Sequence, residues 1–423
     1  MDDPYRVFYE IFVASYYDSD GDGTGDLRGI MQKLDYLNGP DQSRSLNISG
    51  LWLMPIMSSP SYHKYDVMDY YQVDPAYGTV ADFKALAAAC RERGMILIID
   101  LPINHSSSQH PWFQAALAGD QHYSSYYGFS ESFASGYQQV PGSSLYYEAR
   151  FGSHMPDLAL DNPLVRQEIL DICRFWMELG AGGFRLDAVS WFFAGNTTAN
   201  VEFLAWLHRA LRELDETVYL VGEAWSDAGA IIDLYASGIP SFFNFPLAQS
   251  TGLLISSVRA GRGAELSRSL ARLYTQLPEG AIDAPFLTNH DQARSAGALM
   301  GNPVLQKQAA AVYLLLPGNP FIYYGEEIGM KGGSGRDENK RTPFYWSLTD
   351  PTGHCQPPPG ADDIRPVSAG VDVQLKDRAS LLNFYIDVIT IRNRQPGLAR
   401  GTFAALETPH DQICAYRMDY QGE

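Results

Sequence analysis

Charged and polar side chains follow four apolar runs of this 423-residue sequence, each at the point where the run ends. They are Asp100, Asn104 and His105 after the first run, Arg185 and Asp187 after the second, Glu223 after the third, and Asn289, His290 and Asp291 after the fourth. Charge at the carboxyl end of a barrel strand is typical of a catalytic site, because the packed interior of a barrel has no other use for it. The set predicts carboxylates that act on a glycosidic bond.

Two of these carboxyl groups fit the needs of retaining glycoside hydrolysis, which uses a nucleophile and an acid about 5–5.5 Å apart. Asp187 and Glu223 end consecutive predicted strands. Arg185 lies on the same strand face as Asp187, so its charge is expected to favour the ionised carboxylate. Trp225 gives Glu223 an apolar neighbour that is expected to raise its pKa. The alternative is that these groups form ion pairs at a barrel rim.

Apolar or β-rich runs alternate with amphipathic helical stretches along most of the chain. Strand alternating with helix predicts a parallel sheet, and eight repeats predict an α/β protein with a closed (β/α)8 TIM barrel. The strands are expected near 6–13, 48–56, 95–103, 183–188, 218–225, 241–246, 283–289 and 319–325. The helices are expected near 26–37, 79–93, 163–179, 199–214, 263–276, 303–316 and 377–394.

Two long stretches interrupt this alternation. Residues 105–155 are rich in Ser, Tyr, Gly and Gln and are too long for an ordinary strand-to-helix loop, so they predict a small inserted domain. Residues 331–376 predict an active-site loop. The expected domains are therefore a barrel over 1–104 and 156–395, the inserted domain over 105–155, and the beginning of an incomplete C-terminal β domain over 396–423.

The composition of the chain limits the classes of binding partner that are expected. The net charge of -18 argues against nucleic acid or an anionic membrane surface, whereas 26 Tyr and 7 Trp suit stacking on a neutral sugar. No apolar stretch is long enough to span a membrane. The first four residues lack a signal-peptide pattern and the four cysteines are widely separated, so the compartment is not determined. Nothing indicates oligomerisation, and a monomer is the expectation.

The four segments resemble, in content and order, four conserved regions of the α-amylase superfamily of glycoside hydrolases. The resemblance runs from Tyr5 to Arg394. It implies that Asp187 is the nucleophile, that Glu223 is the general acid/base, and that Asp291 binds hydroxyl groups of the reacting sugar. The substrate-binding residues that it and the strand-end pattern predict are Tyr65, Asp66, His105, Arg185, Trp225, His290 and Arg341.

Finer features of the resemblance concern specificity. The segment 155–158 is similar to that of a group between oligo-1,6-glucosidases and neopullulanases, many of whose members are α-amylases. Ala188 follows the nucleophile where α-1,6-specific relatives carry Val, which favours cleavage of α-1,4 bonds. In exo-acting relatives an Asp at the position of Asp66 pairs with an Arg at the position of Arg341 and holds the terminal sugar. That pair predicts a preference for maltooligosaccharides over raw starch. The alternative is a salt bridge at the rim that does not extend into the substrate site.

An acidic loop near the start predicts a metal site. Carboxylates at alternate positions with intervening glycines match the first part of an EF-hand, but Gly29 stands where the final Glu belongs. The resemblance implies a structural Ca²⁺ ion, with Mg²⁺ as a possible substitute, and the alternative is a solvated acidic turn. The implied ligands are Asp18, Asp20, Asp22, the Thr24 carbonyl and Asp26.

The leading hypothesis is a retaining hydrolase of α-1,4-glucosidic bonds in maltooligosaccharides and starch-type α-glucans. An exo-acting α-glucosidase or a 4-α-glucanotransferase is the alternative within enzymes, because water and a sugar hydroxyl can compete for one covalent intermediate. An inactive carbohydrate-binding relative is the alternative outside them. Such relatives usually lose catalytic carboxylates, and this chain has all three.

Overall fold

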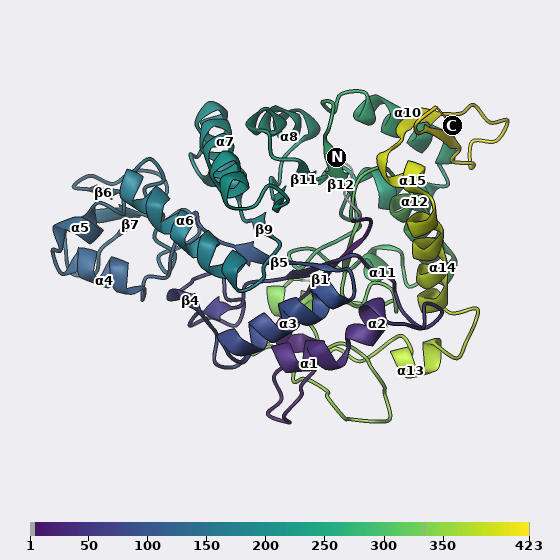
Figure 1. Ribbon diagram of the computed structural model, residues 1–423, viewed down its shortest axis with the longest axis horizontal. Helices are drawn as coiled ribbons and strands as arrows, with labels where there is room; N and C mark the ends of the chain where they lie inside the picture. The colour runs from purple at the N-terminus through teal and green to yellow at the C-terminus, as the bar shows by residue number, and fades with distance from the viewer. Residues whose placement is uncertain (1–4, 334, 423) are drawn as a thin grey trace.

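Eight parallel strands form the centre of the protein (Figure 1). The computed structural model describes residues 5–333 and 335–422, so residues 1–4 of the predicted barrel domain, residue 334 of the predicted loop and residue 423 lie outside this part. The strands are β1 (Phe8–Ile11), β2 (Gly50–Leu53), β5 (Ile96–Leu101), β9 (Gly183–Leu186), β10 (Tyr219–Gly222), β11 (Ser241–Phe243), β12 (Ile282–Ala284) and β13 (Phe321–Tyr323).

The sheet order is β12-β11-β10-β9-β5-β2-β1-β13, and a parallel bridge between Phe286 and Phe321 joins its two ends. The prediction of an α/β (β/α)8 barrel is therefore confirmed. Each of the eight predicted runs overlaps one strand, and β12 begins one residue before its run. All of β5 is buried, as expected for a parallel strand covered on both faces.

Aromatic rings fill part of the barrel interior. Phe8 stacks on Tyr219 and Phe321, with ring centroids 4.8 and 4.7 Å apart. Gly50 makes room for this packing, because a Cβ atom there would lie 2.3 Å from the Phe8 ring. The interior is thus a packed core, and chemistry is left to the strand ends.

Helices surround the strands. Their N-termini follow familiar capping rules: Thr79 and Asp82 form a capping box, and the Asn162 side chain caps a helix with proline in its first turn. The larger ones are α1 (Leu27–Gln32), α2 (Leu34–Asn38), α3 (Val80–Glu92), α6 (Pro163–Glu178), α7 (Thr197–Leu214), α8 (Ala228–Leu234), α9 (Leu253–Ala260), α10 (Gly263–Tyr274), α12 (Pro303–Leu314) and α14 (Leu381–Arg394). Short helices are α11 (Ser295–Ala298), α13 (Val371–Gln374), α15 (Pro396–Arg400), η1 (Val13–Ser15), η2 (Val189–Trp191), η3 (Tyr235–Ser237) and η4 (Asp337–Lys340).

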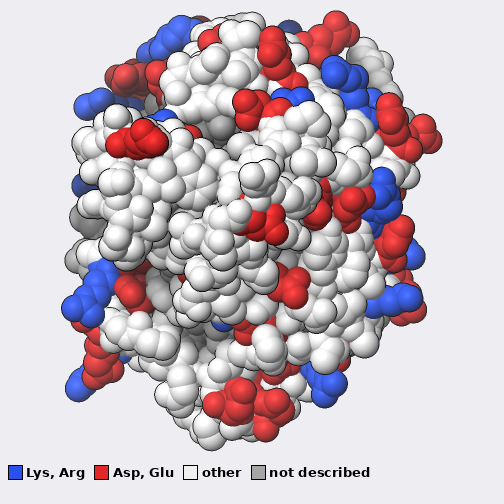
Figure 2. Space-filling model, turned by 90° about the vertical axis from the view of Figure 1, so that its left-hand side faces the viewer, with Lys and Arg blue, Asp and Glu red and all other residues white. Residues whose placement is uncertain are grey.

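Residues 105–155 project to the left in Figure 1. They hold two short helices and a three-stranded antiparallel sheet in the order β6-β8-β7. Figure 2 views the molecule from this side and shows Lys and Arg mainly at the edges of the view. The elements are α4 (Pro111–Leu117), α5 (Gln121–Ser124), β6 (Phe129–Ser130), β7 (Tyr137–Gln139) and β8 (Tyr146–Glu148).

Two hairpins complete the described chain. β3 (Met57–Ser58) and β4 (Asp69–Val73) pair antiparallel beside the barrel, and the loop between them reaches the strand ends. β14 (Thr402–Ala405) and β15 (Tyr416–Asp419) pair near the C-terminal end of the chain. Among the described helices, none has both the length and the apolar character needed to cross a membrane.

Candidate active site

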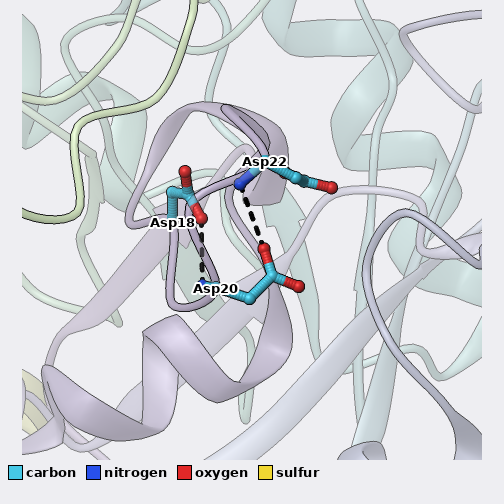
Figure 3. A group of neighbouring side chains, drawn as sticks. All are labelled: Asp18, Asp20 and Asp22. Atoms are coloured by element: carbon cyan, nitrogen blue, oxygen red, sulfur yellow. Dashed lines mark hydrogen bonds between the residues drawn. The ribbon is translucent and has the colours of Figure 1, made fainter.

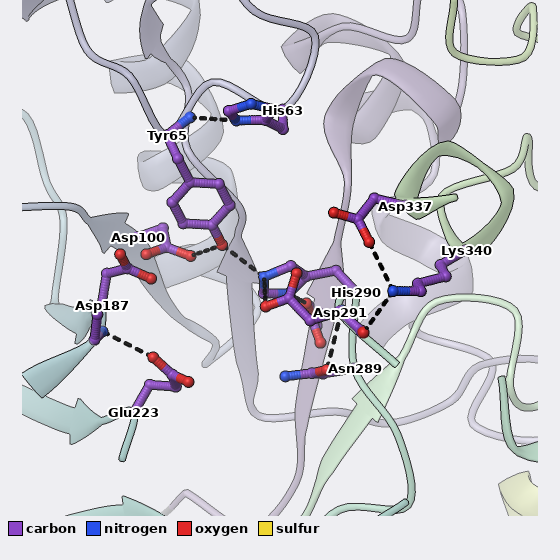
Figure 4. Close-up of polar contacts among 12 residues, drawn as sticks. His63, Tyr65, Asp100, Asp187, Glu223, Asn289, His290, Asp291, Asp337 and Lys340 are labelled. Carbon is purple, nitrogen blue, oxygen red and sulfur yellow. Dashed lines mark hydrogen bonds and ion pairs between the residues drawn. The ribbon is translucent and has the colours of Figure 1, made fainter. Parts of the chain in front are cut away.

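A cavity of about 340 Å³ lies at the carboxyl ends of the barrel strands. Asp187 follows β9, Glu223 follows β10 and Asp291 lies beyond β12, so three separate strands bring their carboxylates to one place. Figure 4 shows Asp187 and Glu223 next to each other, with Asp291 across from them. The cavity is lined by His63, Tyr65, His105, Phe151, Met155, Asp187, Ala188, Trp191, Glu223, Trp225, Asp291, Asp337 and Arg341.

Arg185 lies beneath the carboxylates and is almost completely buried. Its guanidinium donates to Asp187 and, at 2.8 Å, to Asp100, and it lies 3.6 Å from the nearer oxygen of Glu223. Burial raises the pKa of Asp100 to about 7, against the opposing effect of Arg185. Arg185, predicted to bind substrate, does not line the cavity and instead holds the carboxylates of Asp187 and Asp100 in place.

Glu223 has the properties of a general acid. Burial raises its pKa to about 7, the Arg185 charge opposes this shift, and the Asp187 charge adds to it. The backbone N–H of Ala188 donates to Glu223 at 2.8 Å and fixes the carboxyl group. Ala188 adopts a left-handed conformation, with φ of 50°, to reach this position. A carboxyl group with this pKa is largely protonated below neutral pH, as proton donation requires.

Asp291, at the cavity, belongs to a network of alternating charge whose other members are buried. His290 contacts Glu10 through Nδ1 at 2.5 Å and Asp291 through Nε2 at 3.2 Å, and Arg341 donates to Asp291 at 2.9 Å. Burial alone would lower the pKa of His290, but the carboxylates of Asp291 and Glu10 raise it to about 9. Burial alone would raise the pKa of Asp291, but His290 and Arg341 hold it well below its usual range. Asp291 is therefore an acceptor only.

The predicted histidines differ in their surroundings. His105 lines the cavity, and neither of its ring nitrogens has a well-placed hydrogen-bond partner among the described residues, so it is free to bind a ligand. His290 does not line the cavity, and both of its nitrogens are engaged. The prediction that His290 bonds the sugar directly does not fit this arrangement, because Glu10, Tyr65 and Asp291 already use its donors.

The predicted aromatic residues both line the cavity. Tyr65 stacks on His290 with ring centroids 5.6 Å apart, and its hydroxyl donates to Asp100 at 2.9 Å. Trp225 is 48% exposed and stacks on Phe245 at 5.0 Å. Each ring is thus held by the protein on one side and accessible from the cavity.

The predicted ion pair between Asp66 and Arg341 is wrong. Asp66 is buried beside the cavity and accepts hydrogen bonds from Ser59 and Ser61. Arg341 donates hydrogen bonds to Asp291 and, at 3.1 Å, to the Tyr62 hydroxyl. Because two serine hydroxyls already solvate the Asp66 carboxylate, it needs no cation, and the guanidinium goes to the carboxylate that lies nearer to it.

Several contributors were missed from sequence. Glu10 lies inside a continuous apolar run, and a charged residue in such a run is the one signal that could have found it. His63 lies in a loop, Asp337 begins the short helix η4, and Trp191 is a half-exposed tryptophan after β9. Only their positions in space, at one cavity, identify these three residues.

The acidic loop brings some of its predicted ligands together (Figure 3). Carboxylate oxygens of Asp18, Asp20 and Asp22 lie within 4.8 Å of one another, and such hard oxygen donors suit Ca²⁺. The Thr24 backbone N–H donates to Asp22 at 2.7 Å. Asp26 is not in the group, because its carboxylate caps α1 through Gly29 and accepts from Ser19.

An eight-stranded barrel whose strand ends place a glutamic acid of raised pKa beside an aspartate is typical of a glycoside hydrolase. Residues 10–401 match the family model for the α-amylase catalytic domain. The chain belongs to the α-amylase family.

Individual relatives agree with this membership. The structure of Eubacterium rectale Amy13B superimposes with a TM-score of 0.93 and 40% identity, covering 100% of this chain and 85% of that one. Alpha-amylase 3 of Dictyoglomus thermophilum is 39% identical over 99% of this chain and 83% of its own length. The trehalose synthase/amylase TreS of Mycolicibacterium smegmatis is 33% identical over 97% of this chain and 79% of its own length.

Proposed function

We propose that the protein hydrolyses α-1,4-glucosidic bonds in maltooligosaccharides and starch-type α-glucans with retention of configuration. The observation that carries the proposal is the pairing of Glu223, with its pKa of about 7, and Asp187, bound to Arg185, at the ends of neighbouring strands. One group can donate a proton while the other attacks. The similarity to an amylase from D. thermophilum supports α-glucan as the substrate class.

The reaction has two displacements. Asp187 attacks the anomeric carbon while Glu223 protonates the departing glycosidic oxygen, giving a glycosyl-enzyme and a free sugar chain. Glu223, now ionised, takes a proton from water, the water oxygen bonds to the anomeric carbon, and Asp187 leaves. Asp291, as an acceptor, bonds sugar hydroxyl groups, and His105 supplies a further contact inside the cavity.

Two measurements test this mechanism. Proton NMR of a maltoheptaose digest should show the α-anomer first, and a β-anomer first would contradict retention. Asp187→Asn should lower turnover by several orders of magnitude without changing the melting temperature by more than a few degrees. Near-normal turnover of that variant would exclude Asp187 as the nucleophile.

Glycosyl transfer is a second candidate function. A sugar hydroxyl can replace water in the second displacement, and the trehalose synthase/amylase of M. smegmatis supports this possibility for a related chain. Product analysis of end-labelled maltoheptaose separates the two. Products longer than the substrate would favour transfer, and only shorter ones would favour hydrolysis.

We also propose that the group Asp18, Asp20 and Asp22 binds a structural Ca²⁺ ion. The ion would neutralise three neighbouring carboxylates, and binding to the folded state alone would raise the melting temperature. Melting curves with added Ca²⁺, with Mg²⁺ and with chelator test this. A melting temperature that is the same in all three would contradict the proposal, and an equal rise with either ion would leave the metal's identity open to both.

A further inference from the structure

Three side chains form a connected path from the interior of the β3–β4 loop (residues 59–68) to the cavity. Asp66, at its buried end, is only 2% exposed. The Ser61 hydroxyl donates to Asp66, and its oxygen lies 3.1 Å from Nδ1 of His63. The backbone N–H of Tyr65 points at the same Nδ1 at 3.2 Å. With its proton on Asp66, Ser61 accepts from Nδ1 when Nδ1 carries the ring proton, whereas Tyr65 donates to Nδ1 when it does not. In either tautomer one contact to Nδ1 fixes the orientation of the ring.

The other ring nitrogen of His63 is available to a ligand. His63 lines the cavity, and its Nε2 makes no hydrogen bond to any residue in the described part of the chain. Figure 4 shows His63 and Glu223 at opposite ends of the drawn cluster. Glu223 protonates the leaving oxygen in the proposed reaction, so His63 lies toward the sugar units that stay on the enzyme after the first step.

We infer that Asp66 is a positioning residue that acts through Ser61 to hold His63 against a hydroxyl group of the retained sugar. The inference rests on the proposed function, which supplies the sugar. A sugar hydroxyl both donates and accepts hydrogen bonds, so Nε2 can bind it in either neutral tautomer of the imidazole. Burial keeps the ring neutral by lowering the pKa of His63 to about 4.

Asp66 cannot make this contact itself. The residue does not line the cavity, and its Oδ1 accepts hydrogen bonds from Ser61 and, at 2.9 Å, from Ser59. The chain turns sharply between Ser61 and Asp66, with Lys64 in a left-handed conformation at φ of 66°. This turn points His63 toward the cavity and Asp66 away from it.

The test compares Asp66→Asn, Ser61→Ala and His63→Ala in steady-state kinetics on maltotriose. Each should raise KM about five- to tenfold, which is the range for one lost hydrogen bond, and leave kcat within about twofold. The Ser61→Ala/Asp66→Asn double variant should be no worse than either single variant, because both act through one path. Additive effects of the two substitutions would overturn the inference, as would a loss confined to kcat.

Two control variants separate positioning from folding. Ser61→Thr keeps the hydroxyl and should keep the KM of the wild type. Asp74→Asn changes another buried aspartate of the same hairpin, which pairs with Lys64 at 2.7 Å and contacts neither Ser61 nor His63. It should lower the melting temperature without raising KM. If Asp74→Asn raises KM as much as Asp66→Asn, loop destabilisation explains both and the inference is wrong.

NMR of the His63 ring tests the inference without any substrate. NMR signals of the His63 ring should shift and broaden in Asp66→Asn and Ser61→Ala but not in Ser61→Thr, and an unchanged ring in the first two would overturn the inference. Failure of the proposed function has a different signature, because the wild type itself would then release no sugar from α-glucans. If Asp66→Asn does not fold, the comparison of Ser61→Ala with Ser61→Thr still tests the inference.

Discussion

Replacing Glu223 with glutamine should slow the enzyme by an amount that depends on the leaving group. Glutamine has nearly the same shape and can still accept the Ala188 N–H, which contacts Glu223 at 2.8 Å, so the site should keep its form. When maltotriose is cleaved, the oxygen of the departing sugar must be protonated, so kcat/KM for maltotriose should fall about 10²- to 10⁴-fold. α-Glucosyl fluoride releases fluoride, which needs no proton, so its rate should fall by less than about tenfold.

The structure also sets the pH dependence of this step. At pH 6, a carboxyl group with the pKa of about 7 found for Glu223 is about 90% protonated. A glutamic acid with the ordinary pKa of about 4.3 would be only about 2% protonated, so burial enlarges the population of the acid roughly 40-fold. Since the protonated form reacts, kcat/KM for maltotriose should fall about tenfold for each pH unit above 7.

Initial rates on both substrates from pH 4.5 to 9 provide the assay. In Glu223→Gln, kcat/KM for maltotriose should lose the decline near pH 7, because glutamine does not titrate. Glu178→Gln, at an exposed site at the end of α6, is the matched control and should behave as wild type. Equal losses on the two substrates, or a decline near pH 7 that persists in the variant, would refute the assignment of Glu223 as the acid.

Three further substitutions test other parts of the structure. Glu10→Gln removes a charge that stabilises the His290 imidazolium, so an NMR titration should give His290 a lower pKa in the variant than in the wild type, where Asp291 and Glu10 raise it to about 9. Equal pKa values in the two proteins would contradict the network. Burial raises the pKa of Glu326 to about 8, so its contribution to stability is present below pH 4 and is lost as pH rises to 8. The melting temperature of Glu326→Gln should therefore fall less between pH 5 and pH 8 than that of the wild type. An equal fall in both proteins would contradict this. Trp191→Ala removes a 47% exposed ring at the cavity and should raise KM for maltoheptaose a few-fold, whereas an unchanged KM would remove Trp191 from the binding surface.

The barrel could be predicted from the sequence because its strands are short apolar runs separated by long amphipathic helices. Two of the helices that were missed, α8 (Ala228–Leu234) and α9 (Leu253–Ala260), have seven and eight residues. Segments of this length complete about two turns and do not establish a helical period, so an apolar run in them cannot be distinguished from a strand. Only packing against neighbouring elements decides their conformation.

The proximity of the two candidate catalytic carboxylates could be predicted for a related reason. The carboxyl ends of parallel strands converge, so Asp187 and Glu223 had to lie close together once the barrel was assumed. Glu10 had no such signal, because its partner His290 lies 280 residues further along the chain. Its importance arises from one contact across the barrel, which the sequence does not encode locally.

Which acid binds Arg341 is a question of competition, and residue types alone do not answer it. Arg341 has a side chain only 3% exposed, so its charge requires a carboxylate partner, and both Asp66 and Asp291 were candidates. Asp66 receives two serine hydroxyls and Asp291 receives a protonated histidine and the arginine. Neutral donors already bond Asp66. Moving Arg341 to Asp66 would remove a cation from Asp291 and leave the two serine hydroxyls without their acceptor. The two residues that the resemblance predicted to hold a terminal sugar together are therefore connected differently here, and a preference for chain ends does not follow from their presence.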